Sequence, residues 1–217
     1  ARLSWHTADP ARSPGRSRFP GVLDLSGSLE RADGTRVHRY LPLEIPAETR
    51  HYVRDAVTAG SVSQAQFRVK GDLHDLPFNH PSQGDFHIAA KVRGVAYAYV
   101  PPALQAAGER PWPALTDLQG ELVFDRSSMA VKDATGNLAG PGPVRVQKVN
   151  ARIPDLAHTV VGVTADVRAP LNDMLALVGS THIGQLLSGA LDQASATGPG
   201  QLNLNLSLPI SHIEQSK

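Results

Sequence analysis

The chain has 217 residues, of which 41% are hydrophobic, 19% charged and 5% aromatic, and it contains no cysteine. This balance excludes a disordered chain, a disulfide scaffold, a thiolate nucleophile and a cysteine-ligated zinc site. The net charge is +1 and the basic residues are spread along the chain, so the basic stripe with interleaved aromatic residues that is typical of nucleic-acid binding is missing.

The first twenty residues are predicted to form a flexible lead-in or a fragment of a strand. They carry the densest basic run of the chain, Arg12 to Arg18, among Pro, Gly and Ser residues. No apolar run approaches the ~20 residues of a membrane span. Because Ala1 to Trp5 read like the middle of a strand, we expect the chain to be a fragment of a longer protein.

A strand and a helix are predicted next. Residues 22–29 alternate between apolar and polar, which places Leu23 and Leu25 on one face of a strand. A helix is expected over about residues 47–59, because Pro46 suits its first turn and Gly60 suits its end.

Two further strands flank an irregular segment, residues 71–80. In the first, Phe67 and Val69 occupy odd positions, and in the second, Phe86 and Ile88 occupy even positions, as expected for strands that are apolar on one face only. The second strand changes phase at Gly94, which predicts a β-bulge or bend there.

The remaining pattern also indicates strands. Residues 118–124 and a partner that starts near residue 129 predict a hairpin, and residues 161–167 and 201–208 alternate in the same way. Helices are expected within about residues 171–193. The Gly-Pro-Gly-Pro run at 140–143 is a candidate seam between a half at 21–140 and a second half at 141–217, which we expect to share one continuous sheet.

Eight to ten strands with two or three short helices make the chain mainly β. The apolar strand faces have two interpretations: they fill a closed β-sandwich, or they line a curved, open sheet whose apolar face is left for a ligand. Small apolar residues and few aromatic residues fit both, so composition does not separate them.

No catalytic or metal constellation emerges. The acids and histidines around the irregular segment lack the spacing of zinc ligands, so we interpret them as polar loop and strand residues and predict neither metal nor cofactor; they are Asp72, His74, Asp75, His80, Asp85 and His87. Ser26 and Ser188 lack the Gly-x-Ser-x-Gly frame of a nucleophile elbow. We therefore expect a protein that is not an enzyme.

Several motifs, in consistent order from about Arg39 to Pro209, resemble the YhdP family of AsmA-like proteins. They include Arg-Tyr-Leu-Pro at 39–42, Phe-Arg-Val-Lys-Gly-Asp-Leu-His-Asp-Leu-Pro-Phe at 67–78 and Leu-Gln-Gly-Glu-Leu-Val-Phe at 118–124. The motif residues expected to have structural roles are Tyr40, Pro42, Gly71, Asp72, Pro77, Phe78, Trp112 and Pro113.

The resemblance implies a twisted antiparallel sheet that forms an open groove. It implies a periplasmic segment of a longer protein, anchored to the inner membrane through parts outside this chain, that moves phospholipids between the inner and outer membranes. The partners implied are phospholipid acyl chains and neighbouring segments of the same long chain. The alternative is a structural or interaction scaffold of the cell envelope without a lipid site of its own.

If the groove interpretation holds, apolar residues of the alternating strands should face lipid. The candidates are Leu23, Leu25, Phe67, Val69, Phe86, Ile88, Leu122, Phe124, Val161, Val163, Leu204 and Leu206. Each methylene removed from water lowers the free energy by about 0.8 kcal/mol, and the contact has no preferred direction, so an acyl chain could slide along such a surface.

Overall fold

Our computed structural model describes residues 1–41, 46–158, 160–191 and 193–209. Nine strands dominate: β1 (Arg2–His6), β2 (Val22–Asp33), β3 (Val57–Asp72), β4 (Gly84–Tyr97), β5 (Leu115–Asp125), β6 (Ser128–Leu138), β7 (Val144–Ile153), β8 (Val160–Pro170) and β9 (Pro199–Pro209). The helices are α1 (Ala47–Ala56), α2 (Leu171–Ser180) and α3 (His182–Leu186), with 3₁₀ turns η1 (Gly34–Tyr40), η2 (Leu73–Asp75) and η3 (Pro102–Leu104).

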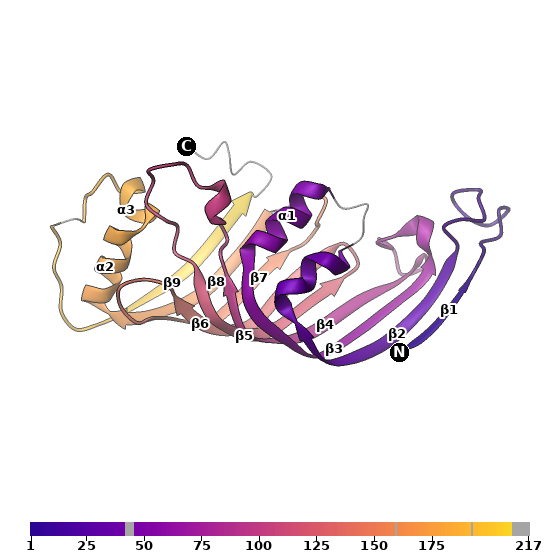
Figure 1. Ribbon diagram of the computed structural model, residues 1–217, viewed down its shortest axis with the longest axis horizontal. Helices are drawn as coiled ribbons and strands as arrows, with labels where there is room; N and C mark the ends of the chain where they lie inside the picture. The colour runs from indigo at the N-terminus through magenta and orange to yellow at the C-terminus, as the bar shows by residue number, and fades with distance from the viewer. Residues whose placement is uncertain (42–45, 159, 192, 210–217) are drawn as a thin grey trace.

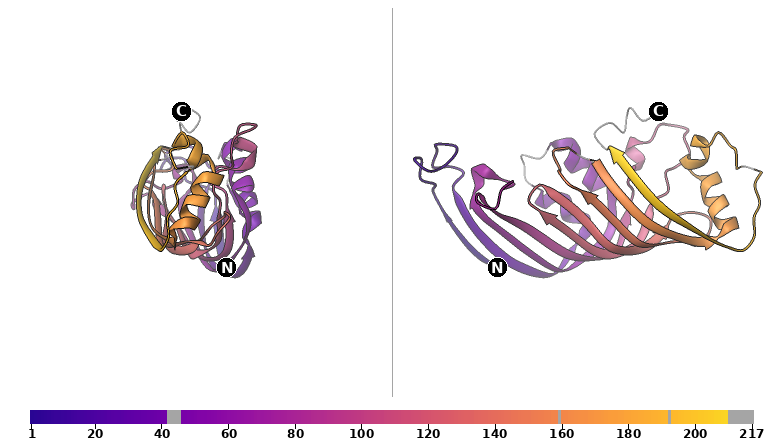
Figure 2. Two further views of the ribbon diagram at one scale, coloured as in Figure 1. Left: turned by 90° about the vertical axis from the view of Figure 1, so that its left-hand side faces the viewer. Right: turned by 180° about the vertical axis from the view of Figure 1, so that it is seen from behind.

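The nine strands form one antiparallel sheet in which each strand pairs with its neighbours in the chain, in the order β1 to β9. The sheet is strongly curved, and α1, α2 and α3 lie on its concave side (Figures 1 and 2). This arrangement confirms the prediction of a mainly β, curved and open antiparallel sheet. The alternative of a closed sandwich is wrong, because the described strands belong to a single sheet.

Strand register explains why one face of the sheet is apolar. Residues that pair across strands point to the same side of a sheet. Leu25 pairs with Val69, and Val69 pairs with Phe86. The residues between them in the chain point the other way, and these are mostly charged or polar. The concave face is therefore apolar and the convex face polar.

Bulges cross the middle of the sheet in five successive strands. In each of β3 to β7 the register shifts beside one residue with a positive φ angle. These residues are Gln64, Gly94, Asp117, Asp133 and Lys148. The phase change expected at Gly94 is thus confirmed, and each of the bulges in β4 to β7 switches which alternate residues of its strand point to the concave side. Both halves of these strands keep their apolar residues there.

The best-buried core lies under α2, on the concave face. Leu177 packs on Val144, Val146 and Val167, and the four side chains are 1–5% exposed. These valines come from the ends of β7 and β8, near the point where the chain enters α2. The core therefore occupies one end of the strands and leaves the other end without a helix above it (Figure 1).

Two helix ends differ from expectation. The helix expected to reach residue 59 ends at Ala56, because Val57 already pairs with Tyr97 in the sheet. Gly60 lies inside β3 rather than at a helix end. The helical region expected to reach residue 193 ends at Leu186, since Ser188 and Gly189 take positive φ angles that no α-helix continues.

The segment at 140–143 joins β6 to β7. These two strands pair along their length, from Met129 with Ile153 to Leu138 with Val144, so the sheet continues across the segment. Near the N-terminus, residues 2–6 form the edge strand β1, which pairs with β2.

Candidate functional site

The apolar concave face is the strongest candidate site, and the strand register assigns residues to it. Phe67 pairs with Ile88, and Ile88 pairs with Phe124. Leu122 lies two residues before Phe124 in β5, so its side chain points to the same side of the sheet. The register of β6 to β9 carries this side on through Val163 to Leu206. All twelve residues predicted to face a lipid lie on this one face.

None of these twelve side chains is buried: eleven are partly exposed, and Leu206 is 41% exposed. On the same face, Val144 is only 1% and Val167 only 4% exposed beneath Leu177. The difference arises because helices cover the concave face at one end of the strands only. An apolar surface of half-covered side chains contributed by most strands of a sheet is unusual for a protein without an apolar ligand or partner.

A cluster of three tyrosines, Tyr52, Tyr97 and Tyr99, fixes α1 over the end of the strands that the helices cover. The Tyr52 hydroxyl donates to the carbonyl of Tyr99 at 3.0 Å and lies 2.9 Å from the Tyr97 hydroxyl, which therefore donates to Tyr52. Burial raises the pKa of Tyr52 and of Tyr97, and it raises the pKa of Tyr99 to about 12. The three phenols are thus neutral at physiological pH, and they serve to hold the helix over the sheet.

A folded-back loop closes part of the opposite end. Phe78 is fully buried, and its ring lies where Cβ atoms on Gly71 and Gly84 would stand. These two glycines pair with each other across β3 and β4, so together they make a flat seat for the ring. The Asp72 carboxylate accepts the backbone N–H of His74 at 3.1 Å and starts η2.

The other motif residues differ in how deeply they are buried. The Trp112 ring stacks on the His182 imidazole with 4.5 Å between ring centroids, and Pro113 is buried beside it. Pro77 follows a cis peptide bond in the loop that carries Phe78. Tyr40 is 79% exposed at the end of η1, and Pro42 lies outside the described residues.

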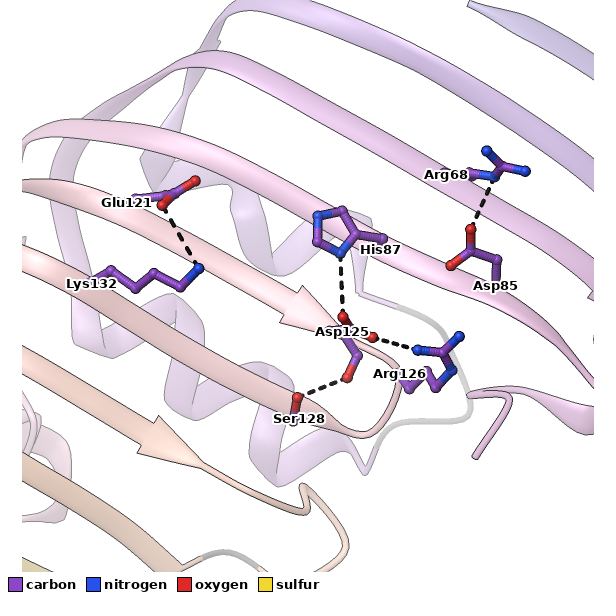
Figure 3. Close-up of polar contacts among 8 residues, drawn as sticks. All are labelled: Arg68, Asp85, His87, Glu121, Asp125, Arg126, Ser128 and Lys132. Carbon is purple, nitrogen blue, oxygen red and sulfur yellow. Dashed lines mark hydrogen bonds and ion pairs between the residues drawn. The ribbon is translucent and has the colours of Figure 1, made fainter. Parts of the chain in front are cut away.

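The convex face carries ion pairs. Figure 3 shows Arg68 with Asp85 at 3.0 Å, Glu121 with Lys132 at 4.0 Å, and Asp125 with His87 at 3.7 Å. All are on the surface, where such pairs contribute ~0–1 kcal/mol. Within the described ranges, no three or more His, Cys, Asp or Glu side chains come together as metal ligands.

Sequence reasoning missed several residues of the apolar concave face. Met129 pairs with Phe124, and Ile153 pairs with Met129. The tight turn between Asp125 and Ser128 fixes this register, so the predicted hairpin could have identified Met129. Trp5 was missed as well, although Leu3 and Trp5 alternate with polar neighbours and Trp5 pairs with Leu23.

The geometry supports binding of something long and apolar. The apolar concave face runs across the strands from β1 to β9, and the polar convex face keeps the sheet in water. The described part of the chain contains no helix with both the length and the apolar character needed to cross a bilayer.

Comparisons with known proteins agree with this geometry. The chain is 25% identical over 190 residues to the intermembrane phospholipid transporter YhdP of Escherichia coli strain K12. The match covers 87% of this chain but only 14% of that relative, so the chain spans a small part of its length. No solved structure matches the chain. The model of the YhdP protein family matches residues 3–217, and the chain therefore belongs to that family.

Proposed function

We propose that this chain is a non-enzymatic, phospholipid-handling segment of a longer protein that moves lipids between the two membranes of a bacterial envelope. The observation that carries the proposal is the apolar concave face, whose twelve predicted lipid-facing side chains share one side of the sheet and remain partly exposed. Family membership and the similarity to an intermembrane phospholipid transporter support the choice of ligand.

The physics of transport fits such a face. An acyl chain gains about 0.8 kcal/mol for each methylene that it removes from water, wherever along the face it lies. Since no hydrogen bond must break as the chain shifts, movement along the sheet meets low barriers. The lipid then needs no chemical step, which is why we propose no catalytic residue.

We further propose that the segment works in the periplasm and that neighbouring segments of the same long chain continue the sheet. The edge strands β1 and β9 present backbone groups to which further strands can pair. Attachment to the inner membrane would be provided by parts of the protein outside this chain.

Native mass spectrometry of the purified chain, followed by lipid extraction, tests the proposal. Phe67→Asp and Leu122→Asp place a carboxylate on the apolar concave face, where an acyl chain would strip it of water, so co-purified phospholipid should be lost. Gln66→Asp and Gln119→Asp are matched controls: Gln66 is next to Phe67, Gln119 lies three residues before Leu122, and both are exposed, convex-facing sites of the same strands.

The controls should keep the lipid, and all four variants should retain the circular dichroism of the wild-type sheet. Unchanged lipid recovery in folded Phe67→Asp and Leu122→Asp would refute the assignment of the face. A wild-type chain that never carries lipid would favour the scaffold alternative.

A further inference from the structure

The connection between β1 and β2, residues 7–21, is an ordered loop and is called here the arginine loop. The Ala8 N–H donates to the Arg18 carbonyl at 3.0 Å, which extends the hairpin beyond the strands, and Ala8 is 5% exposed. Gly15 packs against the imidazole of His74 in the next loop along the same edge. The arginine loop extends past the end of β1 and β2, at the edge of the sheet away from α2 and α3 (Figure 1).

The apolar concave face continues onto this loop. Trp5 points to the concave side with its partner Leu23, and its ring lies against Gly21, where any Cβ would collide with it. The indole N–H donates to the Pro20 carbonyl at 3.0 Å, which fixes the ring. Phe19 stacks on the indole at 6.2 Å, and the two rings are 64% and 46% exposed for Phe19 and Trp5.

The same loop carries three arginines. Arg12, Arg16 and Arg18 are exposed, and among the described residues none of their guanidinium groups has a carboxylate within ion-pair distance. Asp9 is the one acid of the loop, and it accepts the Ala11 N–H at 3.0 Å. The loop therefore joins exposed aromatic surface to unpaired cations, at the rim of the apolar concave face.

We propose that the arginine loop binds the phosphate of a phospholipid whose acyl chains lie on the apolar concave face, from Trp5 and Leu23 inward. This inference rests on the proposed function and names the part of the lipid that the loop recognises. Arginine offers forked N–H donors that match phosphate oxygens, and charged hydrogen bonds of this kind are stronger than neutral ones. Aromatic rings beside arginines suit the boundary between a polar head group and its apolar chains.

The test compares two soluble lipids with the same chains, dioctanoylphosphatidylglycerol and dioctanoylglycerol, each below its micelle concentration. Isothermal titration measures their binding to the wild-type chain and to the triple variant Arg12→Gln/Arg16→Gln/Arg18→Gln. The control is Arg145→Gln/Arg152→Gln/Arg168→Gln, which removes the same charge from exposed positions on the convex face.

We expect the loop variant to bind dioctanoylphosphatidylglycerol at least about 20-fold more weakly, since each arginine near a lipid phosphate contributes roughly fivefold. Its affinity for dioctanoylglycerol should not change, and the control variant should match the wild type with both lipids. Added salt should weaken binding of the phosphate lipid to the wild type more than to the loop variant.

Equal affinity of the loop variant and the wild type for the phosphate lipid would overturn this inference and leave the proposed function intact. If the loop variant lost only capture by phosphatidylglycerol vesicles, the loop would recognise a bilayer surface, and the single-lipid site would be wrong. A wild-type chain that binds neither lipid would refute the proposed function, and the inference with it.

Discussion

Replacing Phe78 with alanine should destabilise the chain more than any exchange at an exposed position of the same loop. The ring is fully buried on the seat made by Gly71 and Gly84, so its removal leaves a void that backbone glycines cannot fill. Buried Phe→Ala exchanges cost about 3–5 kcal/mol of the free energy of unfolding. For a domain of this size, that loss lowers the melting temperature by about 6–20 °C.

Thermal unfolding followed by circular dichroism measures this effect. Leu76→Ala is the matched control, because Leu76 lies two residues away and is 41% exposed, so its loss should cost less than about 1 kcal/mol. Equal melting temperatures for the two variants would refute the reasoning, since they would mean that the Phe78 ring does not pack on the glycine pair.

Two further predictions concern the tyrosine cluster. Tyr52→Phe leaves the Tyr97 hydroxyl without its acceptor, so it should lower the free energy of unfolding by about 0.5–1.5 kcal/mol and speed up amide hydrogen exchange in α1. Tyr40→Phe, at a 79% exposed position, should change neither the free energy of unfolding nor the exchange rate. Equal exchange in the two variants would contradict the role of the cluster. Because folding raises the pKa of Tyr99 to about 12 from its ordinary value near 10, stability should be full below about pH 10 and fall as the pH rises toward 12. In the Tyr40→Phe variant, which removes the exposed tyrosine, phenolate absorbance that develops in the folded chain at about pH 10 would argue against burial of these phenols.

The alternating strands could be predicted from sequence because a single period of two carries the signal. Phe67, Phe86 and Leu122 were assigned to one apolar face, and the register places them there. The extent to which that face is covered could not be predicted. It depends on Leu177 settling over Val144, a contact between distant residues that no local pattern records.

Other differences have local causes. Gly60 resembled a helix end, but strand pairing from Val57 onward overrides the helical preference of the preceding residues. The bulge at Gly94 was predicted because the apolar residues of this strand change from even to odd positions there. The bulge at Lys148 was not predicted, although the apolar residues of β7 change from even positions at Val144 and Val146 to an odd position at Val149. The bulge at Asp117 follows only two residues of its strand, which are too few to show a change of phase.

The bulges in β4 to β7 make the apolar concave face depend on the backbone conformation of one residue in each of these strands. If Asp133 took an ordinary strand conformation instead, the two halves of β6 would form one alternation, and Ala134 and Leu138 would turn toward water while Val131 stayed in place. A change in the backbone conformation of this one exposed polar residue would therefore invert half a strand, whereas deletion of Asp133 would leave both halves facing as they do now. In this chain, exposed residues on the bulges decide which side of the sheet is apolar.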